Sequence, residues 1–324
     1  MFSKYIVGVL AVFFVQVVYA SDWDELKHLN QSGSKEHFSG SYISQLDGRV
    51  GSFRIDHALF AGIEFDKRVA TSGLERELIK KGDTIRIYAQ SAPAFEAARI
   101  DHLRAFPFVL PKDMTHLSKS YNLKNNGLDR VAGRECQKYI VQAKDRSKYN
   151  QRLCVDKQTG VTLRQEIYFN NKPIEVQSFS EITFKSIPKA RFNGNKKLKL
   201  WNERAISPIS ISGGYKSLSK SSEPILKGLP EGFSVIGEKA GSNRKDKSAK
   251  HYILTDGLIQ LSLFVEPAQN SYFSELSGGK TQAYSLNGAL SIASLNKGIY
   301  RLTILGFMPP QSLRSILNTV STVK

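Results

Sequence analysis

The residues best suited to catalysis are three serines, each followed three positions later by a lysine that could activate it as a nucleophile. They lie at Ser32–Lys35, Ser217–Lys220 and Ser242–Lys245. In a chain rich in serine and lysine this spacing arises by chance, and the companion S-D-N and K-T-G elements are absent. G-x-S-x-G and H-E-x-x-H are missing as well. The sequence therefore predicts a protein that is not an enzyme.

The sequence also contains no clear motif for a phosphate-binding site or a metal site. Residues 278–281 read Gly-Gly-Lys-Thr, like the end of a phosphate-binding loop, but Ser274 occupies the position of its first glycine. We interpret this stretch as a turn. The histidines lack the spacing of metal ligands, so we expect no metal and no cofactor. They are His28, His37, His57, His102, His116 and His251.

The start of the chain has the layout of a secretory signal peptide. Lys4 precedes an apolar run over residues 5–18, and the small residues Val18 and Ala20 occupy the −3 and −1 positions of a cleavage site. A membrane anchor is the alternative, but the run is shorter than the roughly 20 residues that a spanning helix needs. We expect cleavage after Ala20 and export of the mature protein.

The two cysteines, Cys136 and Cys154, lie symmetrically about Asp145 in a segment that reads strand, polar turn, strand. In an antiparallel hairpin turning there, opposed Cα atoms are about 4.5–5.5 Å apart, a separation that a disulfide accepts. A redox-active pair is the alternative, but C-x-x-C spacing is absent. Because an oxidising compartment favours the bond, we expect a structural disulfide.

Composition and charge narrow the class of partner. Of 324 residues, 41% are hydrophobic and 23% are charged, proportions typical of a folded globular protein. The formal net charge of +17 predicts affinity for acidic partners. Export argues against nucleic acid, and it leaves phospholipid or lipopolysaccharide headgroups, or an acidic protein.

The segments that would position these residues are mainly β-strands. A short amphipathic helix is predicted over about 22–30, with Asp22 and Glu25 at capping-box spacing. Residues 92–124 are predicted to be helical and loop-like. Short strands joined by turn signals predict a large antiparallel meander within residues 21–188. The predicted strands are 40–46, 49–55, 74–79, 84–89, the two cysteine strands, 161–169 and 174–184.

The rest of the chain divides into two parts. Residues 189–227 carry nine Lys or Arg against two acids, which predicts a basic linker or connecting segment. An exposed terminal strand pair and a solvated loop are the alternatives. Residues 228–324 are predicted to form a smaller antiparallel sheet ending in a helix, because apolar residues at 313, 316, 317 and 320 form one stripe.

A half-buried sheet with helices on one side can enclose an apolar cavity that binds amphiphiles. We expect aromatic residues to line it and basic residues at its rim to meet phosphates or carboxylates. Ordinary core packing and a solvated face are the alternatives. The candidate lining residues are Phe53, Phe60, Phe65, Tyr88, Phe95, Phe106 and Phe108, and the candidate rim residues are Arg49, Arg54, Arg76 and Lys80.

Several stretches resemble the MucB/RseB family, and together they cover nearly all of the mature chain in the family's order. In the first unit they are residues 37–42 (HFSGSY), 51–57 (GSFRIDH), 75–79 (ERELI), 106–111, 127–136 and 149–160. In the second unit they are residues 229–233 (LPEGF), 255–258 (TDGL) and 305–310 (LGFMPP).

The resemblance implies a periplasmic regulator of a sigma-E or AlgU envelope-stress sigma factor. Such proteins bind the periplasmic domain of a membrane anti-sigma factor (RseA or MucA type) and shield it from proteolysis. The implied release signals are lipopolysaccharide or lipoprotein acyl chains. The implied large domain is LolA/LolB-like, an unclosed antiparallel β-barrel with helices in its concave face. A periplasmic carrier of lipidated proteins is the alternative function, and a homo-oligomer stays open.

Overall fold

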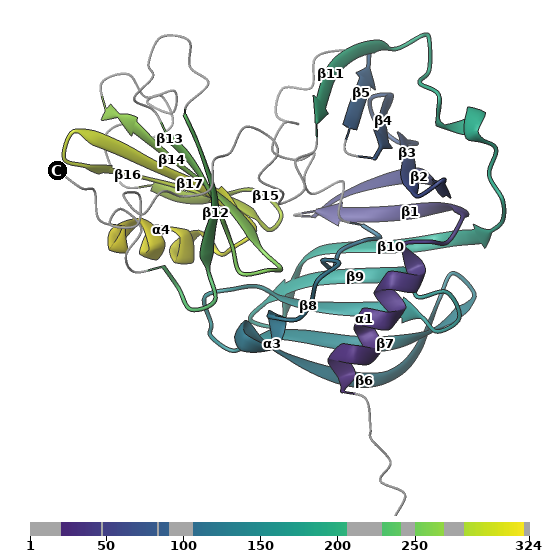
Figure 1. The fold of residues 1–324 in the computed structure, drawn as a ribbon, viewed down its shortest axis with the longest axis horizontal. Helices are drawn as coiled ribbons and strands as arrows, with labels where there is room; N and C mark the ends of the chain where they lie inside the picture. The colour runs from purple at the N-terminus through teal and green to yellow at the C-terminus, as the bar shows by residue number, and fades with distance from the viewer. Residues whose placement is uncertain are drawn as a thin grey trace, which may run out of the picture.

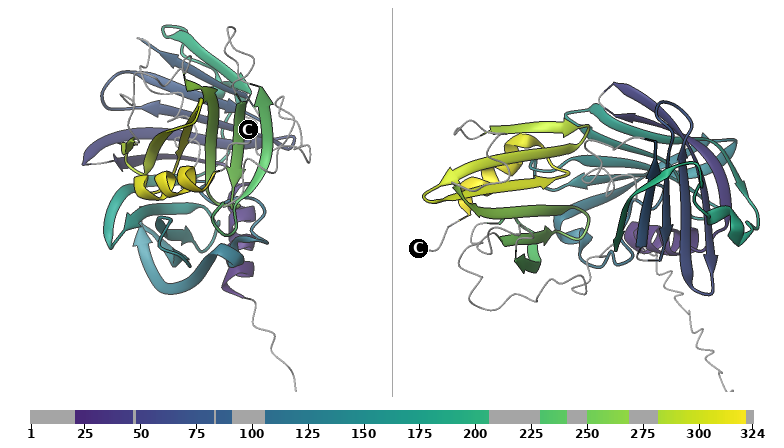
Figure 2. Two further views of the ribbon diagram at one scale, coloured as in Figure 1. Left: turned by 90° about the vertical axis from the view of Figure 1, so that its left-hand side faces the viewer. Right: turned by 90° about the horizontal axis from the view of Figure 1, so that it is seen from above.

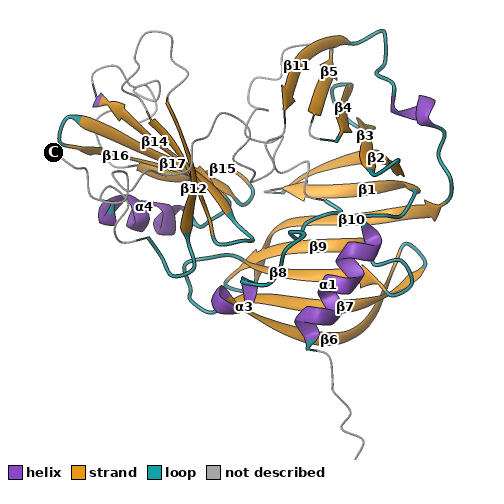
Figure 3. Ribbon diagram, viewed as in Figure 1, coloured by secondary structure: helices purple, strands orange, loops and turns teal. Residues whose placement is uncertain are grey.

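The described residues form two antiparallel sheets, one of eleven strands and one of six (Figure 1). The computed structural model describes residues 21–46, 48–82, 84–90, 106–205, 229–240, 250–268 and 282–320. Strands dominate both units (Figure 3), so the mainly β architecture predicted from the sequence is confirmed. The predicted signal peptide lies outside the described residues. Among those residues, no helix is both long and apolar enough to cross a membrane.

The large sheet is built of hairpins whose short turns join neighbouring strands. Its order is β11-β5-β4-β3-β2-β1-β10-β9-β8-β7-β6, so β1 and β10 pair in the middle and join an early meander to a later one. β6 and β11 end the sheet without pairing with each other, which leaves it open. The strands are β1 (Phe38–Leu46), β2 (Arg49–Phe60), β3 (Ile63–Ala70), β4 (Arg76–Lys81), β5 (Thr84–Ala89), β6 (Tyr121–Val131), β7 (Arg134–Ala143), β8 (Asn150–Asp156), β9 (Thr162–Phe169), β10 (Lys172–Phe184) and β11 (Lys199–Ala205).

Helix α1 (Asp22–Gly33) crosses one face of strands β6 to β9 (Figure 1). Its N-cap is Ser21 rather than Asp22, since the Ser21 hydroxyl accepts a hydrogen bond from the Asp24 amide. Leu26 is fully buried with Tyr139 of β7. The predicted amphipathic helix is therefore confirmed, and it covers the half of the sheet that holds the disulfide.

The end of α1 lies against the turn between β8 and β9. A Cβ atom added to Gly33 would stand 2.5 Å from the Gly160 carbonyl oxygen, and one added to Gly160 would overlap the Leu29 carbonyl. Gly160 also has a φ of +80°, which only glycine adopts without strain. Two glycines are thus required where helix and sheet meet.

The segment between the two groups of strands differs from its prediction. Residues 106–116 contain no helix or strand, and α3 (Leu117–Ser120) is a single turn. The strand β6 begins at Tyr121, so the predicted helical and loop-like region ends too late. The reason is that β6 alternates weakly: most of its residues are exposed, because it is an end strand. Residues 91–105 lie outside the described part of the chain.

The basic segment that follows β10 contributes to the large sheet. A single 3₁₀ turn, η1 (Lys189–Phe192), is followed by β11, which pairs antiparallel with β5. Ile187, Phe192 and Leu198 are buried. The first part of this segment is therefore packed on the sheet, while residues 206–228 lie outside the description.

The small sheet has the order β12-β13-β14-β17-β16-β15 and one helix, α4 (Pro310–Thr319), packed on it (Figure 2). Leu313, Ile316 and Leu317 are buried against the sheet, which confirms the predicted apolar stripe. The strands are β12 (Ser234–Ala240), β13 (Lys250–Thr255), β14 (Gln260–Pro267), β15 (Gln282–Asn287), β16 (Leu290–Lys297) and β17 (Tyr300–Gly306).

A buried charge pair joins the two sheets. Lys148, in the β7–β8 connection, lies with its Nζ atom 3.0 Å from an Asp256 carboxylate oxygen in the β13–β14 turn. The Tyr121 hydroxyl donates to the same carboxylate at 2.7 Å. Nearby, the Ala289 amide donates to the Glu175 carboxylate at 2.6 Å. The domain junction is therefore held by directional polar contacts as well as by apolar packing.

Candidate binding site

An aromatic cluster occupies one face of the large sheet, which we call the inner face. Tyr42 of β1 pairs directly with Phe53 of β2 and with Phe179 of β10, so the three rings stand in one row across the sheet. Phe106 covers that row, with its ring centroid 5.1 Å from those of Tyr42 and Phe179. Phe106 is fully buried. The cluster is a packed aromatic core that connects β1, β2 and β10.

The seven aromatic residues predicted to line one cavity do not share a face. Phe53, Phe106 and Phe108 lie on the inner face. Phe60 and Phe65 pack with Phe192 on the opposite face, which we call the outer face. The cause is strand periodicity: side chains alternate between faces, and Phe53 and Phe60 are seven residues apart on β2.

Tyr88 also lies on the outer face, because its pairing partner on β4 is Glu77, and the side chain of Glu77 contacts residue Asn195 there. Phe95 falls outside the described residues. The prediction of a single cavity lined by all seven aromatic side chains is therefore corrected: three belong to the inner face and three to the outer face.

The four predicted rim residues separate in the same way. Arg76 and Lys80 of β4 lie on the inner face, where the Arg76 guanidinium carbon stands 5.7 Å from the Phe53 ring centroid. Arg54 is exposed on the outer face, and Arg49 is exposed at the start of β2. Arg68 lies on the inner face and is buried. Of the predicted rim residues, those that border the aromatic cluster therefore lie on β4, next to Arg68 of β3.

Tyr42 is an inner-face aromatic residue that was not predicted from the sequence, and the same holds for Phe38 and Phe179. The Tyr42 side chain is 1% exposed, and burial raises the pKa of its hydroxyl, while the charges of Arg68 and Arg76 act to lower it. The available signal was its spacing from Phe38 in an alternating strand, which places both rings on the same face.

Beside the aromatic cluster lies a buried ionic group. His57 Nδ1 and an Asp66 carboxylate oxygen are 2.6 Å apart, and the His57 ring centroid is 4.5 Å from that of Phe108. Burial acts to raise the pKa of Asp66, but the charge and hydrogen bond of His57, with Lys80 and Arg68, hold that pKa well below its usual range. Asp66 is therefore ionised in the folded protein.

The same group contains donors of the type that bind metals. Ligand atoms of His57, Glu64 and Asp66 lie within 4.8 Å of one another. However, the Lys80 ammonium stands 2.7 Å from Glu64 and 3.6 Å from Asp66, between the two carboxylates. The side chains therefore form an ionic network in which a lysine of the chain itself supplies a cation to both carboxylates.

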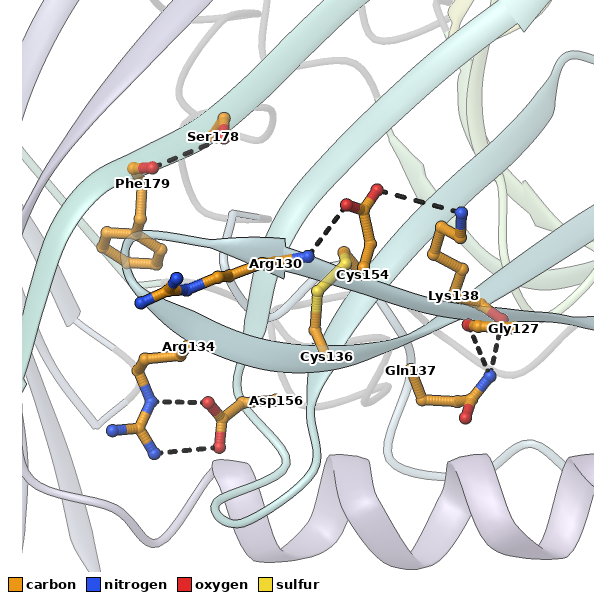
Figure 4. The surroundings of a disulfide bond; sticks show 11 residues. Gly127, Arg130, Arg134, Cys136, Gln137, Lys138, Cys154, Asp156, Ser178 and Phe179 are labelled. Carbon is orange, nitrogen blue, oxygen red and sulfur yellow. Dashed lines mark hydrogen bonds and ion pairs between the residues drawn. A yellow bond between two sulfur atoms is a disulfide. The ribbon is translucent and has the colours of Figure 1, made fainter.

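The disulfide joins β7 to β8 at the far side of the cluster (Figure 4). Cys136 and Cys154 are bonded, with their Cα atoms 5.3 Å apart. They are not directly opposed as predicted, since Cys136 pairs with Asp156 and Cys154 pairs with Lys138. The centre of the hairpin lies one residue later than Asp145, so the cysteines are diagonal neighbours, which is still close enough for the bond.

Arg134 lies at the end of the inner face that is next to the disulfide. It forms two hydrogen bonds with the Asp156 carboxylate (Figure 4), and its guanidinium carbon stands 4.6 Å from the Phe184 ring centroid. Burial acts to raise the pKa of Asp156, but these bonds and those from Thr159 lower it overall. The inner face thus has apolar rings at its centre and paired charges at both ends.

Comparison with known sequences identifies the family. The sequence model for the MucB/RseB N-terminal domain matches residues 21–197, and that for the MucB/RseB C-terminal domain matches residues 220–321. The chain belongs to the MucB/RseB family. The N-terminal match extends past Phe192, in keeping with the packing of that segment on the large sheet.

Relatives match this MucB/RseB chain along most of its length. The sigma-E factor regulatory protein RseB of Salmonella typhimurium is 23% identical over 298 residues, which cover 91% of this chain and 89% of the relative. The sigma factor AlgU regulatory protein MucB of Pseudomonas aeruginosa is 25% identical over 268 residues, which cover 80% of this chain and 78% of the relative.

Solved structures agree with the fold. The structure of the Pseudomonas aeruginosa MucA/MucB complex matches with a TM-score of 0.70 at 18% identity, covering 94% of this chain and all of the matched chain. A crystal structure of MucB matches with a TM-score of 0.63 at 17% identity, and the match covers 93% of this chain and 97% of the matched chain. Both units of this MucB/RseB member therefore have the family fold.

Proposed function

We propose that this protein is a periplasmic regulator that binds the periplasmic domain of a membrane anti-sigma factor of the RseA or MucA type. By covering that domain it protects the anti-sigma factor from proteolysis and so represses an envelope-stress response. The observation that carries the proposal is the match of both family domains over residues 21–197 and 220–321. The similarity of the fold to MucB solved with MucA supports the same partner class.

The proposal is one of binding rather than catalysis. The sequence lacks the common nucleophile and zinc motifs, and the buried ionic groups of the inner face are paired with one another. In this proposal, export followed by cleavage behind Ala20 brings the protein to the same compartment as its partner. The experiment is titration of the mature protein with the periplasmic domain of the cognate anti-sigma factor; a 1:1 complex that slows proteolysis of that domain is expected, and unchanged cleavage would contradict the proposal.

Release by an amphiphile is the second part of the proposal. Because Phe106 fills the centre of the inner-face cluster, a lipid chain that enters there has to displace Phe106. A ligand that binds only the partner-free conformation weakens partner binding, because its affinity differs between the partner-free and partner-bound conformations. Lipopolysaccharide or a lipoprotein acyl chain should therefore lower the affinity for the anti-sigma domain.

The test is the same titration at saturating lipopolysaccharide or with an acylated lipopeptide. Weaker binding to the anti-sigma domain is expected, and unchanged affinity rejects the coupling while leaving the partner proposal intact. Recovery of stoichiometric acylated protein from the envelope, without any binding of the anti-sigma domain, would instead favour a carrier of lipidated proteins.

A further inference from the structure

Residues 185–199 form a strap across the outer face of the large sheet, here called the basic strap. The Arg191 guanidinium lies 3.0 Å from the Asp56 carboxylate on β2. The Lys67 ammonium on β3 donates to the Asn193 carbonyl at 2.8 Å. The Asn195 amide donates to Glu77 on β4 at 2.9 Å. The basic strap is therefore fixed to three successive strands before it continues into β11.

Apolar contacts fix the basic strap as well. Phe192 and Ile187 are buried in a cluster with Ala58 and Phe65. A Cβ atom on Gly194 would stand 2.5 Å from the Tyr88 ring, so the backbone of the strap lies directly on that side chain. The strap is thus a packed element with a defined solvent-facing side.

That solvent-facing side is positively charged. Residues 185–202 contain no acidic residue. Lys185, Lys189, Lys196 and Lys197 are exposed, whereas the only arginine of the strap is engaged by Asp56. The lysines are therefore open to a partner, although Lys189 also makes a cation–π contact with Phe65 of β3.

Cations from the underlying strands extend the same surface. Arg54 of β2 and Lys81 of β4 are exposed on the outer face, and the ammonium groups of Lys81 and Lys189 each stand 5.7 Å from the Phe65 ring centroid. The acids Asp56 and Glu77 beneath the strap are buried and paired. From β1 to β5 the strands span about 19 Å, at roughly 4.8 Å for each spacing.

We propose that the basic strap and the cations around it dock the protein on the surface of an anionic phospholipid bilayer. The charges are spread over a broad outer face rather than gathered around a pocket. They are mainly lysines, which act as hydrated point charges, whereas arginines would suit bidentate recognition of one phosphate. An array of this kind fits the diffuse negative potential of a lipid surface, to which each basic residue adds independently. The inference does not depend on the anti-sigma partner.

The test is co-sedimentation of the mature full chain with vesicles of phosphatidylcholine containing phosphatidylglycerol, and with vesicles of phosphatidylcholine alone. Wild-type protein should bind the anionic vesicles and lose binding as salt rises. The variant K189Q/K196Q/K197Q should bind them about 100-fold more weakly, since each lysine near an anionic surface is worth about five-fold. The matched control K119Q/K124Q/K144Q removes three exposed lysines elsewhere and should bind like wild type.

Three results would overturn the docking surface: no wild-type binding to anionic vesicles at low salt, equal loss in both triple variants, or unchanged binding by the strap variant. Circular dichroism checks that both variants are folded. Titration with the anti-sigma domain without lipid should give wild-type affinity for the strap variant. Loss of that affinity with vesicle binding retained would assign the basic strap to an acidic protein instead.

Discussion

At the scale of single residues, two buried side chains on the inner face contribute to the stability of the fold. Phe106 fills the space between Tyr42 and Phe179, and Asp66 is held ionised by His57, Lys80 and Arg68. One residue contributes apolar packing and the other a fixed charge. A substitution of Phe106 therefore lowers stability by loss of packing, whereas a substitution of Asp66 lowers it by loss of an electrostatic interaction.

Replacement of Phe106 by alanine should lower the free energy of unfolding by about 3–5 kcal/mol, because it leaves a cavity inside a packed aromatic cluster. Denaturant unfolding followed by intrinsic fluorescence gives the value. Phe108→Ala is the matched control and should cost less, since Phe108 is only half-buried. Equal losses would show that Phe106 is not the centre of the cluster.

Asp66→Asn should lower the free energy of unfolding by about 1–3 kcal/mol, because His57 loses its charged partner in a buried site. The effect should depend on pH. Since the pKa of folded Asp66 lies below the unfolded value of about 3.9, its stabilisation is complete above that value and is lost as pH falls further.

Unfolding curves at pH 7 and below pH 4 measure both parts of this prediction. The gap in stability between wild type and Asp66→Asn should shrink on acidification. The exposed Asp145→Asn is a suitable control, because asparagine retains the oxygen that accepts from the Ser147 amide. A gap that stays constant with pH would contradict the ionised state of Asp66.

At the scale of elements, the β7–β8 hairpin and the basic strap reinforce the large sheet. The disulfide links the two strands at diagonal positions, and the strap brings β11 to the edge of β5. Local turn residues form the individual hairpins. The disulfide then links β7 to β8, and the basic strap links β10 to β11 at the other end of the sheet.

Removal of the disulfide by C136A/C154A should lower the free energy of unfolding by about 3 kcal/mol on the chain-entropy model for a loop of this length. Denaturant unfolding of wild type in a reducing agent should show a similar loss, which serves as the control. Alkylation before reduction should find no free thiol in the oxidised protein. A labelled cysteine in that experiment would refute the bond.

At the scale of the whole molecule, the relative position of the two sheets depends on the junction between Lys148, Tyr121 and Asp256. Both side chains of the ion pair are almost fully buried. Burial, together with the charge and hydrogen bond of Asp256, raises the pKa of Tyr121 well above its usual range, so that hydroxyl remains a donor. The Lys148 ammonium also lies 5.2 Å from the Phe233 ring centroid.

Asp256→Asn should destabilise the protein by about 3–5 kcal/mol, because it leaves the Lys148 ammonium buried without a counter-charge. Calorimetry should show the two domains unfolding separately in this variant. The double variant K148M/D256N should recover part of the loss, since it removes the unpaired charge. An unchanged melting temperature for Asp256→Asn would show that the ion pair does not hold the domains together.

Sequence reasoning predicted features whose signals are local. Turn residues located most of the hairpins, although β3 was not predicted, apolar spacing located α1 and α4, and the cysteines predicted a bond that the structure contains. It was less reliable where exposure weakens the alternating pattern, as in β6, and it treated Phe53 and Phe60 as neighbours in one cavity. Strand β2 continues to Phe60, five residues beyond the predicted end, and a seven-residue separation within one strand places the two rings on opposite faces.

The sequence by itself determined the mainly β class, most of the hairpins and the family, because these follow from short-range propensities and from motif order. Only the tertiary structure decided which side chains meet. Lys148 and Asp256 are 108 positions apart, and Asn195 and Glu77 are 118 positions apart. Such contacts arise when separate sheets pack or a strap crosses a face. Pairing register and packing geometry set them, and neither is encoded in local spacing.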